Sequence, residues 1–195
     1  HGYSQEVGQV ERLISPEITS TNEVIFRLKA PAATSVKLSG NWMPMVPNAN
    51  GQGASRQLVE LVKDQAGVWS TKVQALAPEL YGYSFIVDGV TTLDPANLKV
   101  ARDGTFRSEN LLYIAGPASD LYWAKTGPKG SVHQIWYESK TLNLTRRMQV
   151  YTPPGYEDSK ASYPVMYLLH GGGGDEEAWP TLGVAANILD NLINA

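Results

Sequence analysis

The feature that most constrains this chain is an apolar run that ends at a cluster of glycines. Residues 165–169 read Val-Met-Tyr-Leu-Leu, and His170 and the four glycines 171–174 follow at once. A continuous apolar run bounded by glycine is typical of a strand that is buried on both faces of a parallel sheet. The sequence therefore predicts a buried strand at residues 165–169 that leads into a tight loop.

The glycines of this loop have a chemical use. Glycine adopts positive φ readily and lets the backbone approach another group closely, and N–H groups freed in such a loop can face a negative charge. Acyl transfer builds that charge on an oxygen in its transition state, and removing one preorganised donor costs about 3–4 kcal/mol. In α/β-hydrolases one donor comes from a His-Gly-Gly-Gly-type loop after the third strand. We therefore take Gly172 and Gly173 as candidate oxyanion-hole donors.

Two other interpretations of the glycines remain open, a plain strand–helix turn and a phosphate nest. A P-loop is disfavoured because no Lys-Ser/Thr pair follows the glycines. We expect His170 to tie the loop together by hydrogen bonds rather than to act as a catalytic base, which must reach the nucleophile. Trp179 is a candidate for the wall of an acyl pocket, with a packing role as the alternative.

The sequence after the loop predicts a helix. Asp175 is a candidate N-cap, and the apolar residues beyond it recur at helical spacing. They are Leu182, Ala185, Ala186, Leu189, Leu192 and Ile193. Before the loop, residues 132–139 and 146–151 are expected to form an antiparallel pair around a turn near residues 142–143.

Composition narrows the classes of function. The formal net charge of −3 offers no basic footprint for nucleic acid. The chain has no cysteine, so neither disulfides nor a thiolate metal site can form. No apolar run is long enough to span a bilayer. We expect no metal, no cofactor, no nucleic-acid partner and no membrane partner.

The first part of the chain has a different texture. Short runs of alternating apolar and polar residues, separated by proline and glycine, predict a small β-sandwich from about residue 15 to residue 115. The clearest strand is residues 81–87, followed by Asp88-Gly89, a strong hairpin signal. Its expected core face carries Tyr81, Tyr83, Phe85 and Val87.

Aromatic residues outside these strands raise two further expectations. Trp42 follows Gly40-Asn41 in a proline-rich loop and is a candidate carbohydrate-binding residue, because an exposed aromatic face can hold a sugar by apolar contact. Packing on its own sandwich is the alternative. Residues 117–130 read as a connector, yet they carry Leu-Tyr-Trp at 121–123, so we expect this connector to dock against one or both domains.

Two resemblances to known families agree with each other. Residues 146–179 resemble carbohydrate esterase family 1 and related enterochelin-esterase-like hydrolases, through the segments 147–156 and 163–171. Residues 15–115 resemble an immunoglobulin-like early-set sandwich of the family 48 carbohydrate-binding type. The segments that carry this likeness are 39–42, 67–69, 81–89 and 94–95. Ser84 and Thr91 stand where starch-binding members have a lysine and a second tryptophan.

Together the resemblances imply a secreted or periplasmic feruloyl esterase that hydrolyses ferulate esters on arabinoxylan through a Ser-His-Asp triad. The expected fold is an all-β sandwich, residues 1–116, a docked linker, residues 117–130, and the first strands and helix of an α/β-hydrolase, residues 131–195. No Gly-x-Ser-x-Gly occurs in the 195 residues, so we expect no catalytic nucleophile, triad aspartate or triad histidine here. The remainder of the hydrolase domain should cover residues 131–195. Acetyl xylan esterase and a carbohydrate-binding or structural module without catalysis are the alternatives.

Overall fold

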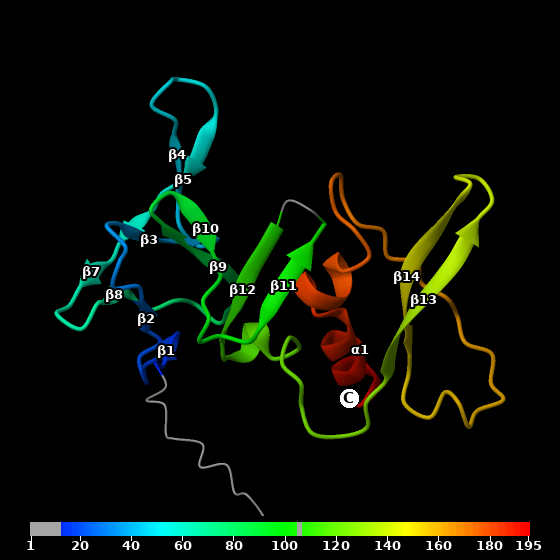
Figure 1. Ribbon diagram of the computed structural model, residues 1–195. Helices are drawn as coiled ribbons and strands as arrows, with labels where there is room; N and C mark the ends of the chain where they lie inside the picture. The colour runs from blue at the N-terminus through cyan, green and yellow to red at the C-terminus, as the bar shows by residue number, and fades with distance from the viewer. Residues whose placement is uncertain (1–12, 105–106) are drawn as a thin grey trace, which may run out of the picture.

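The structure is a computed structural model that describes residues 13–104 and 107–195 (Figure 1). It is mostly β-sheet, with two facing sheets in the first part of the chain. The smaller one has the order β1 (Glu17–Ile18), β2 (Val24–Lys29), β8 (Val68–Val73), β7 (Val62–Lys63). The larger one has the order β11 (Val100–Asp103), β12 (Arg107–Ile114), β9 (Glu79–Val87), β3 (Val36–Gly40), β6 (Val59–Glu60), and β10 (Val90–Thr92) pairs with β9.

The remaining elements lie around these sheets. A small hairpin, β4 (Met45–Pro47) with β5 (Ala54–Arg56), projects from the sandwich (Figure 1). The later part of the chain contributes a 3₁₀ turn (Pro117–Ser119), the hairpin β13 (Ser131–Ser139) and β14 (Leu144–Thr152), a π-helical turn (Ala178–Leu182) and helix α1 (Ala185–Ile193).

The core of the sandwich follows from strand alternation. Side chains at every second position of β2, β3, β9 and β12 point between the sheets, and Phe26, Tyr83 and Phe85 are fully buried there. The Phe26 and Tyr83 rings meet edge to face with centroids 4.8 Å apart, a favoured aromatic geometry. The predicted β-sandwich is confirmed.

The predicted strand and hairpin are also confirmed. Tyr83 and Phe85 are buried, and Tyr81 and Val87 pack against the same core. Asp88 and Gly89 take φ of 48° and 88°, the left-handed values that a two-residue hairpin turn requires. The turn pairs Val87 with Val90 across β9 and β10.

A buried hydrogen-bond network around Asp94 lies at the edge of this core. The buried Asp94 carboxylate accepts hydrogen bonds from the Ser15 hydroxyl at 2.6 Å and from the Tyr83 hydroxyl at 2.8 Å. The Asn110 side chain accepts the backbone N–H of Asp94 at 2.7 Å. Burial, followed by the Asp94 charge, raises the pKa of Tyr83 well above its ordinary value, so the phenol stays a donor.

The predicted buried strand at residues 165–169 is wrong. This segment has no strand pairing, and its side chains are 42–84% exposed. A strand needs a neighbour for its backbone hydrogen bonds, and within the described residues β13 and β14 pair only with each other. Residues 165–169 therefore run as an extended segment between β14 and the helical end of the chain (Figure 1).

The hairpin and helix expected beyond residue 131 are present. β13 and β14 pair antiparallel from Ser131↔Thr152 to Ser139↔Leu144, with Asn143 at φ 50° in the turn. Helix α1 covers the latter part of the predicted apolar repeat, and Leu182 falls in the π-helical turn before it. Its buried side chains are the polar Asp190 and Asn191, whereas Leu192 is exposed.

The connector, residues 117–130, explains why polar helix residues are buried. The Asn191 amide donates to the carbonyls of Leu121 and Trp123 at 2.9 and 2.8 Å. The Asp190 carboxylate accepts the Gly130 N–H and the Tyr151 hydroxyl, both at 2.8 Å. The connector thus contacts α1 and β14 through hydrogen bonds.

The connector also contacts the sandwich. The Trp123 ring stacks on Tyr113 of β12, with centroids 4.9 Å apart and planes 21° apart. Polar contacts on one side and an aromatic stack on the other therefore hold the later part of the chain against the sandwich.

Candidate functional site

The glycine loop, residues 171–174, is a tight turn. The Gly174 N–H donates to the Gly171 carbonyl at 3.1 Å, and Gly173 has φ of 84°. Among the described residues, no acceptor is hydrogen-bonded to the amides of Gly172 or Gly173. A Cβ added at Gly172 would meet no atom within 4 Å, so this side of the loop is open. Within the described residues both candidate donors are unbonded, and Gly172 is next to open space.

The tip of the β11–β12 hairpin packs directly on this loop. A Cβ on Gly104 would collide with the Gly173 carbonyl, and a Cβ on Gly174 would collide with the Asp103 carboxylate. Gly104 also has φ of 64°, which favours glycine. The Gly104 backbone therefore meets the Gly173 backbone directly, and the Asp103 carboxylate fits against Gly174 because glycine has no side chain.

Two polar contacts fasten the same interface. The Arg102 N–H donates to the Thr181 hydroxyl at 2.8 Å, and that hydroxyl donates to the Arg102 carbonyl at 2.9 Å. The Arg102 guanidinium lies 3.8 Å from the Asp175 carboxylate. Strand β11 thus gains a side-chain partner in the π-helical turn that follows the loop.

Asp175 connects the loop to both sides of this interface. Its carboxylate accepts the Glu177 N–H at 3.0 Å. Burial acts to raise the pKa of Asp175, but the N–H groups of Glu177 and Gly104 and the Arg102 charge outweigh it and hold this pKa below its usual value. Asp175 therefore closes the turn before the π-helical segment. The predicted role of Asp175 as a helix N-cap is wrong, because neither that segment nor α1, which begins after Val184, has a side-chain cap.

His170 and Trp179 lie beside the loop, near Asp103 of the sandwich. The His170 Nδ1 atom is 2.8 Å from the Gly171 carbonyl, so the ring binds the loop as expected. The Trp179 indole N–H donates to the Leu169 carbonyl at 3.1 Å. Both side chains line a mainly apolar cavity of about 280 Å³, together with Asp103 of the sandwich. Trp179 as an acyl-pocket residue stays a prediction, now with a cavity at its side.

Trp42 lies elsewhere, against its own sandwich. Its ring stacks on Phe26 at 5.9 Å and meets Tyr81 edge to face at 5.6 Å. A Cβ on Gly40 would collide with the indole, so the ring covers that glycine closely. Trp42 is half-buried in a packing role, and its binding of carbohydrate stays a prediction.

The contact between the β11–β12 hairpin and the glycine loop was not predicted. Asp103-Gly104 is a turn dipeptide that sequence can identify as a hairpin. Its partner, Gly173-Gly174, lies about 70 positions away, and no local pattern encodes that distance. The one signal in the sequence is the glycines themselves, which are Gly104 and the pair Gly173-Gly174.

In residues 13–104 and 107–195, no group of three His, Asp or Glu side chains is placed to hold a metal ion. Over the same residues, no helix has the length and apolar character needed to cross a membrane.

Comparison with known proteins gives one informative relative. The chain is 31% identical over 184 residues to an endo-1,4-beta-xylanase/feruloyl esterase of Xylanibacter ruminicola. The match covers 91% of this chain and 24% of the relative. The chain therefore spans about a quarter of that relative's length.

Likeness to solved structures is partial. The chain has a TM-score of 0.48 and 18% identity to the enterobactin esterase FES from Shigella flexneri, covering 69% of this chain and 42% of that one. It has a TM-score of 0.38 and 21% identity to the GBS pullulanase SAP in complex with maltotetraose, covering 56% and 16%. Likeness at this level establishes neither fold nor function. No family model matches the sequence.

Proposed function

We propose that this chain is the sandwich and the first part of the hydrolase domain of a serine esterase of the carbohydrate esterase family 1 type. The complete protein would be secreted or periplasmic and would release ferulate from feruloylated arabinoxylan. The sandwich would bind the xylan or shape the rim of the active site. The relative named as a xylanase/feruloyl esterase supports this class of substrate.

The observation that carries the proposal is the pair of amides at Gly172 and Gly173, which no acceptor in residues 13–104 and 107–195 binds. They belong to a loop that a hydrogen bond closes, that the His170 ring binds and that Asp103 and Gly104 at the end of β11 contact closely. Donors held rigidly before the reaction stabilise developing charge without reorganising, which is what an oxyanion hole requires.

In the proposed reaction a serine hydroxyl attacks the ester carbonyl and gives its proton to a histidine, so the carbonyl π bond breaks and its oxygen becomes an oxyanion. The amide of Gly172 or of Gly173 donates one hydrogen bond to that oxygen, and the proposal assigns the second donor to the residue after the nucleophile. The ester C–O bond then breaks, the sugar leaves as an alcohol with that proton, and water hydrolyses the feruloyl-serine to release ferulate. No Gly-x-Ser-x-Gly occurs in these 195 residues, so the proposal assigns the nucleophile and its histidine and aspartate to the remainder of the hydrolase domain.

The experiment uses the longer protein that we propose carries this chain, assayed on methyl ferulate and on acetylated xylan. Hydrolysis of methyl ferulate supports the proposal, and hydrolysis of acetylated xylan alone favours an acetyl xylan esterase. Absence of both activities in a folded protein would contradict an esterase and leave a binding or structural module.

One pair of variants tests the amide itself. Gly172→Pro removes the N–H and should lower kcat by roughly 10²–10³-fold, the loss seen for an oxyanion-hole donor. Gly172→Ala keeps the N–H, and its Cβ meets open space, so its loss should be far smaller. Equal losses in the two variants would show that the amide is not a donor.

A further inference from the structure

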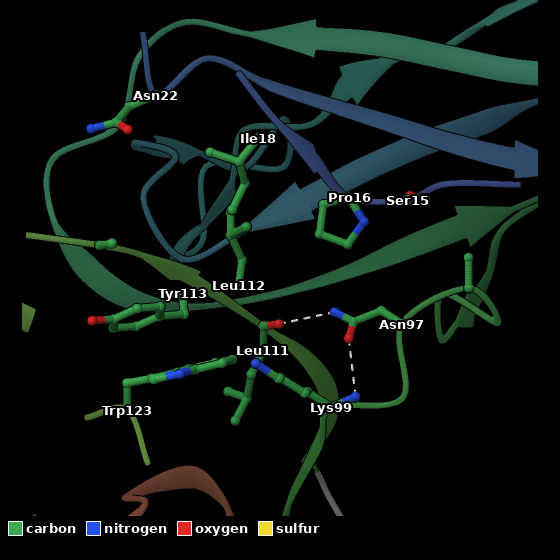
Figure 2. A pocket seen from close by; sticks show the side chains of 12 residues that line it. Ser15, Pro16, Ile18, Asn22, Asn97, Lys99, Leu111, Leu112, Tyr113 and Trp123 are labelled. Carbon is green, nitrogen blue, oxygen red and sulfur yellow. Dashed lines mark hydrogen bonds between the residues drawn. The ribbon is translucent and has the colours of Figure 1, made fainter. Parts of the chain in front are cut away.

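A second cleft lies on the sandwich and shares no lining residue with the cavity beside the glycine loop. Its volume is about 470 Å³, within the range of small-molecule sites. Strand β1, the segment before β11, strand β12 and the connector surround it (Figure 2). The lining residues that matter here are Pro16, Ile18, Asn97, Lys99, Tyr113 and Trp123.

An aromatic pair forms one side of this cleft. Leu112 and Ile114 of β12 are buried in the core, so the alternation of the strand directs Tyr113 to the opposite face. Trp123 stacks on it and keeps 43% of its surface exposed. The stack restrains both rings, so a ligand that lies against them does not have to order them first.

Polar groups stand around the aromatic pair. The Lys99 ammonium lies 3.1 Å from the centroid of the Trp123 ring. In the part of the chain that the structure describes, the Lys99 ammonium, the Tyr113 hydroxyl and the Asn22 side chain make no hydrogen bond to the protein. The Tyr113 hydroxyl and the Asn22 side chain can therefore bind a ligand, and the Lys99 ammonium, held against the Trp123 ring, keeps its N–H groups for one.

Asn97 has a different part in the cleft. Its side-chain amide donates to the Leu111 carbonyl at 2.9 Å, and its side-chain oxygen accepts the Lys99 backbone N–H at 3.0 Å (Figure 2). The same amide also donates to the Tyr83 hydroxyl at 3.1 Å. With these bonds made, Asn97 fixes the wall of the cleft and the backbone of Lys99. The cleft is therefore a shaped surface with a rigid polar edge.

This combination fits a sugar. Sugar rings present apolar C–H faces that pack on aromatic rings and hydroxyl groups that bind nearby donors and acceptors. No carboxylate lines the cleft, which disfavours a cationic ligand. Trp42, the residue that sequence favoured, is packed on Phe26 and Gly40 instead.

We propose that the cleft between β1, β12 and the connector binds a short run of neutral xylan sugar units, with the Tyr113 ring as the stacking surface, Trp123 as its support from behind, and Lys99 and Asn22 as hydrogen-bonding groups. This inference rests on the proposed carbohydrate-active function. It places the polysaccharide next to the connector, where the sandwich meets the later part of the chain.

The test is calorimetric titration of the 195-residue protein with xylohexaose. Tyr113→Ala should weaken binding by roughly tenfold, the size expected for one lost aromatic contact. Lys99→Met keeps the length of the side chain and should also weaken binding. Trp136→Ala is the matched control, because Trp136 is an exposed tryptophan of β13 outside the cleft, and it should bind as the parent does.

Several results would overturn the inference. The first is that xylohexaose does not bind, and the second is that Tyr113→Ala and Lys99→Met both bind it as the parent does. The third is that Trp42→Ala loses binding while Tyr113→Ala keeps it. Hydrolysis of methyl ferulate by the longer protein separates this inference from the proposed function. Hydrolysis of methyl ferulate without binding of xylohexaose refutes sugar binding in the cleft and leaves the proposed esterase standing. Binding of xylohexaose without hydrolysis of either methyl ferulate or acetylated xylan supports sugar binding in the cleft and refutes the proposed esterase.

Discussion

The sandwich and residues 131–195 have similar local patterns but end in different states. In the sandwich, alternating apolar residues find partners on the facing sheet, and Val24, Phe26 and Ile114 are fully buried. In residues 131–195, the buried side chains are Asp190 and Asn191, and large apolar side chains stay exposed. An apolar pattern produces a core only where a second apolar surface is available to cover it.

The way residues 131–195 attach to the rest follows from this difference. The contacts that hold them are the Arg102–Thr181 hydrogen bonds, the close glycine packing at the β11–β12 hairpin and the amide of Asn191 on the connector. The hydrogen bonds are directional and set the position of residues 131–195. Neither they nor the glycine contact bury much apolar surface. The glycine loop is thus positioned by the sandwich more than by its own neighbours in sequence.

The largest effect should separate the two regions by stability. Phe26→Ala removes a fully buried ring and should lower the free energy of unfolding by about 3–5 kcal/mol. Leu169→Ala, at an exposed position, should change it by less than about 0.5 kcal/mol. Denaturant unfolding measures both, and comparable losses would show that residues 165–169 are packed after all.

A smaller effect is expected at the connector. Asn191→Ala leaves the carbonyls of Leu121 and Trp123 without their donor and should cost about 1–3 kcal/mol. Asn194→Ala, which loses one exposed bond to the Pro128 carbonyl, is the control. Amide exchange in α1 should rise in the first variant and stay near the parent in the second; identical exchange would contradict a connector that holds the helix.

The contact between β11 and the π-helical turn should give an effect of about 1 kcal/mol, typical of one hydrogen-bonding side chain. Thr181→Val removes the hydroxyl that bonds both backbone groups of Arg102. Amide hydrogen exchange at Asp175 and Glu177 should rise in this variant. The control is Thr145→Val, which removes an exposed hydroxyl bonded to Glu138 and should not change exchange at Asp175 and Glu177. Unaltered exchange after Thr181→Val would show that glycine packing alone holds the loop.

The smallest effect concerns pH. Burial and the Asp190 carboxylate raise the pKa of Tyr151 to about 12, from 10. A raised pKa favours the neutral phenol in the fold, so its stabilising contribution is complete below pH 10 and is lost as pH rises from 10 through 12. The pKa values of Tyr81 and Tyr83 are raised as well, so Tyr151→Phe should remove only the step near pH 12 from the tyrosine absorbance titration. If the curves of the two proteins match, the Tyr151–Asp190 bond is not formed.

How much the sequence could predict differs between the regions for the same reason. The strand at 81–87, its Asp88-Gly89 turn and the β13–β14 hairpin are local patterns, and each was predicted correctly. The buried strand at 165–169 failed because its pattern states only that the side chains are apolar, and burial depends on neighbours that local sequence does not supply. The contact between Gly104 and Gly173 could not be predicted for the same reason, because it joins segments that are distant in the sequence.

The most direct test of the account is amide hydrogen exchange at Gly172 and Gly173, measured beside Tyr83 of β9 in the same protein. The account predicts exchange at Gly172 and Gly173 close to the rate of an unprotected chain, and strong protection at Tyr83, whose strand is paired on both sides. Protection of Gly172 and Gly173 equal to that of Tyr83 would show that both amides already have internal acceptors, and the oxyanion-hole assignment would then be wrong.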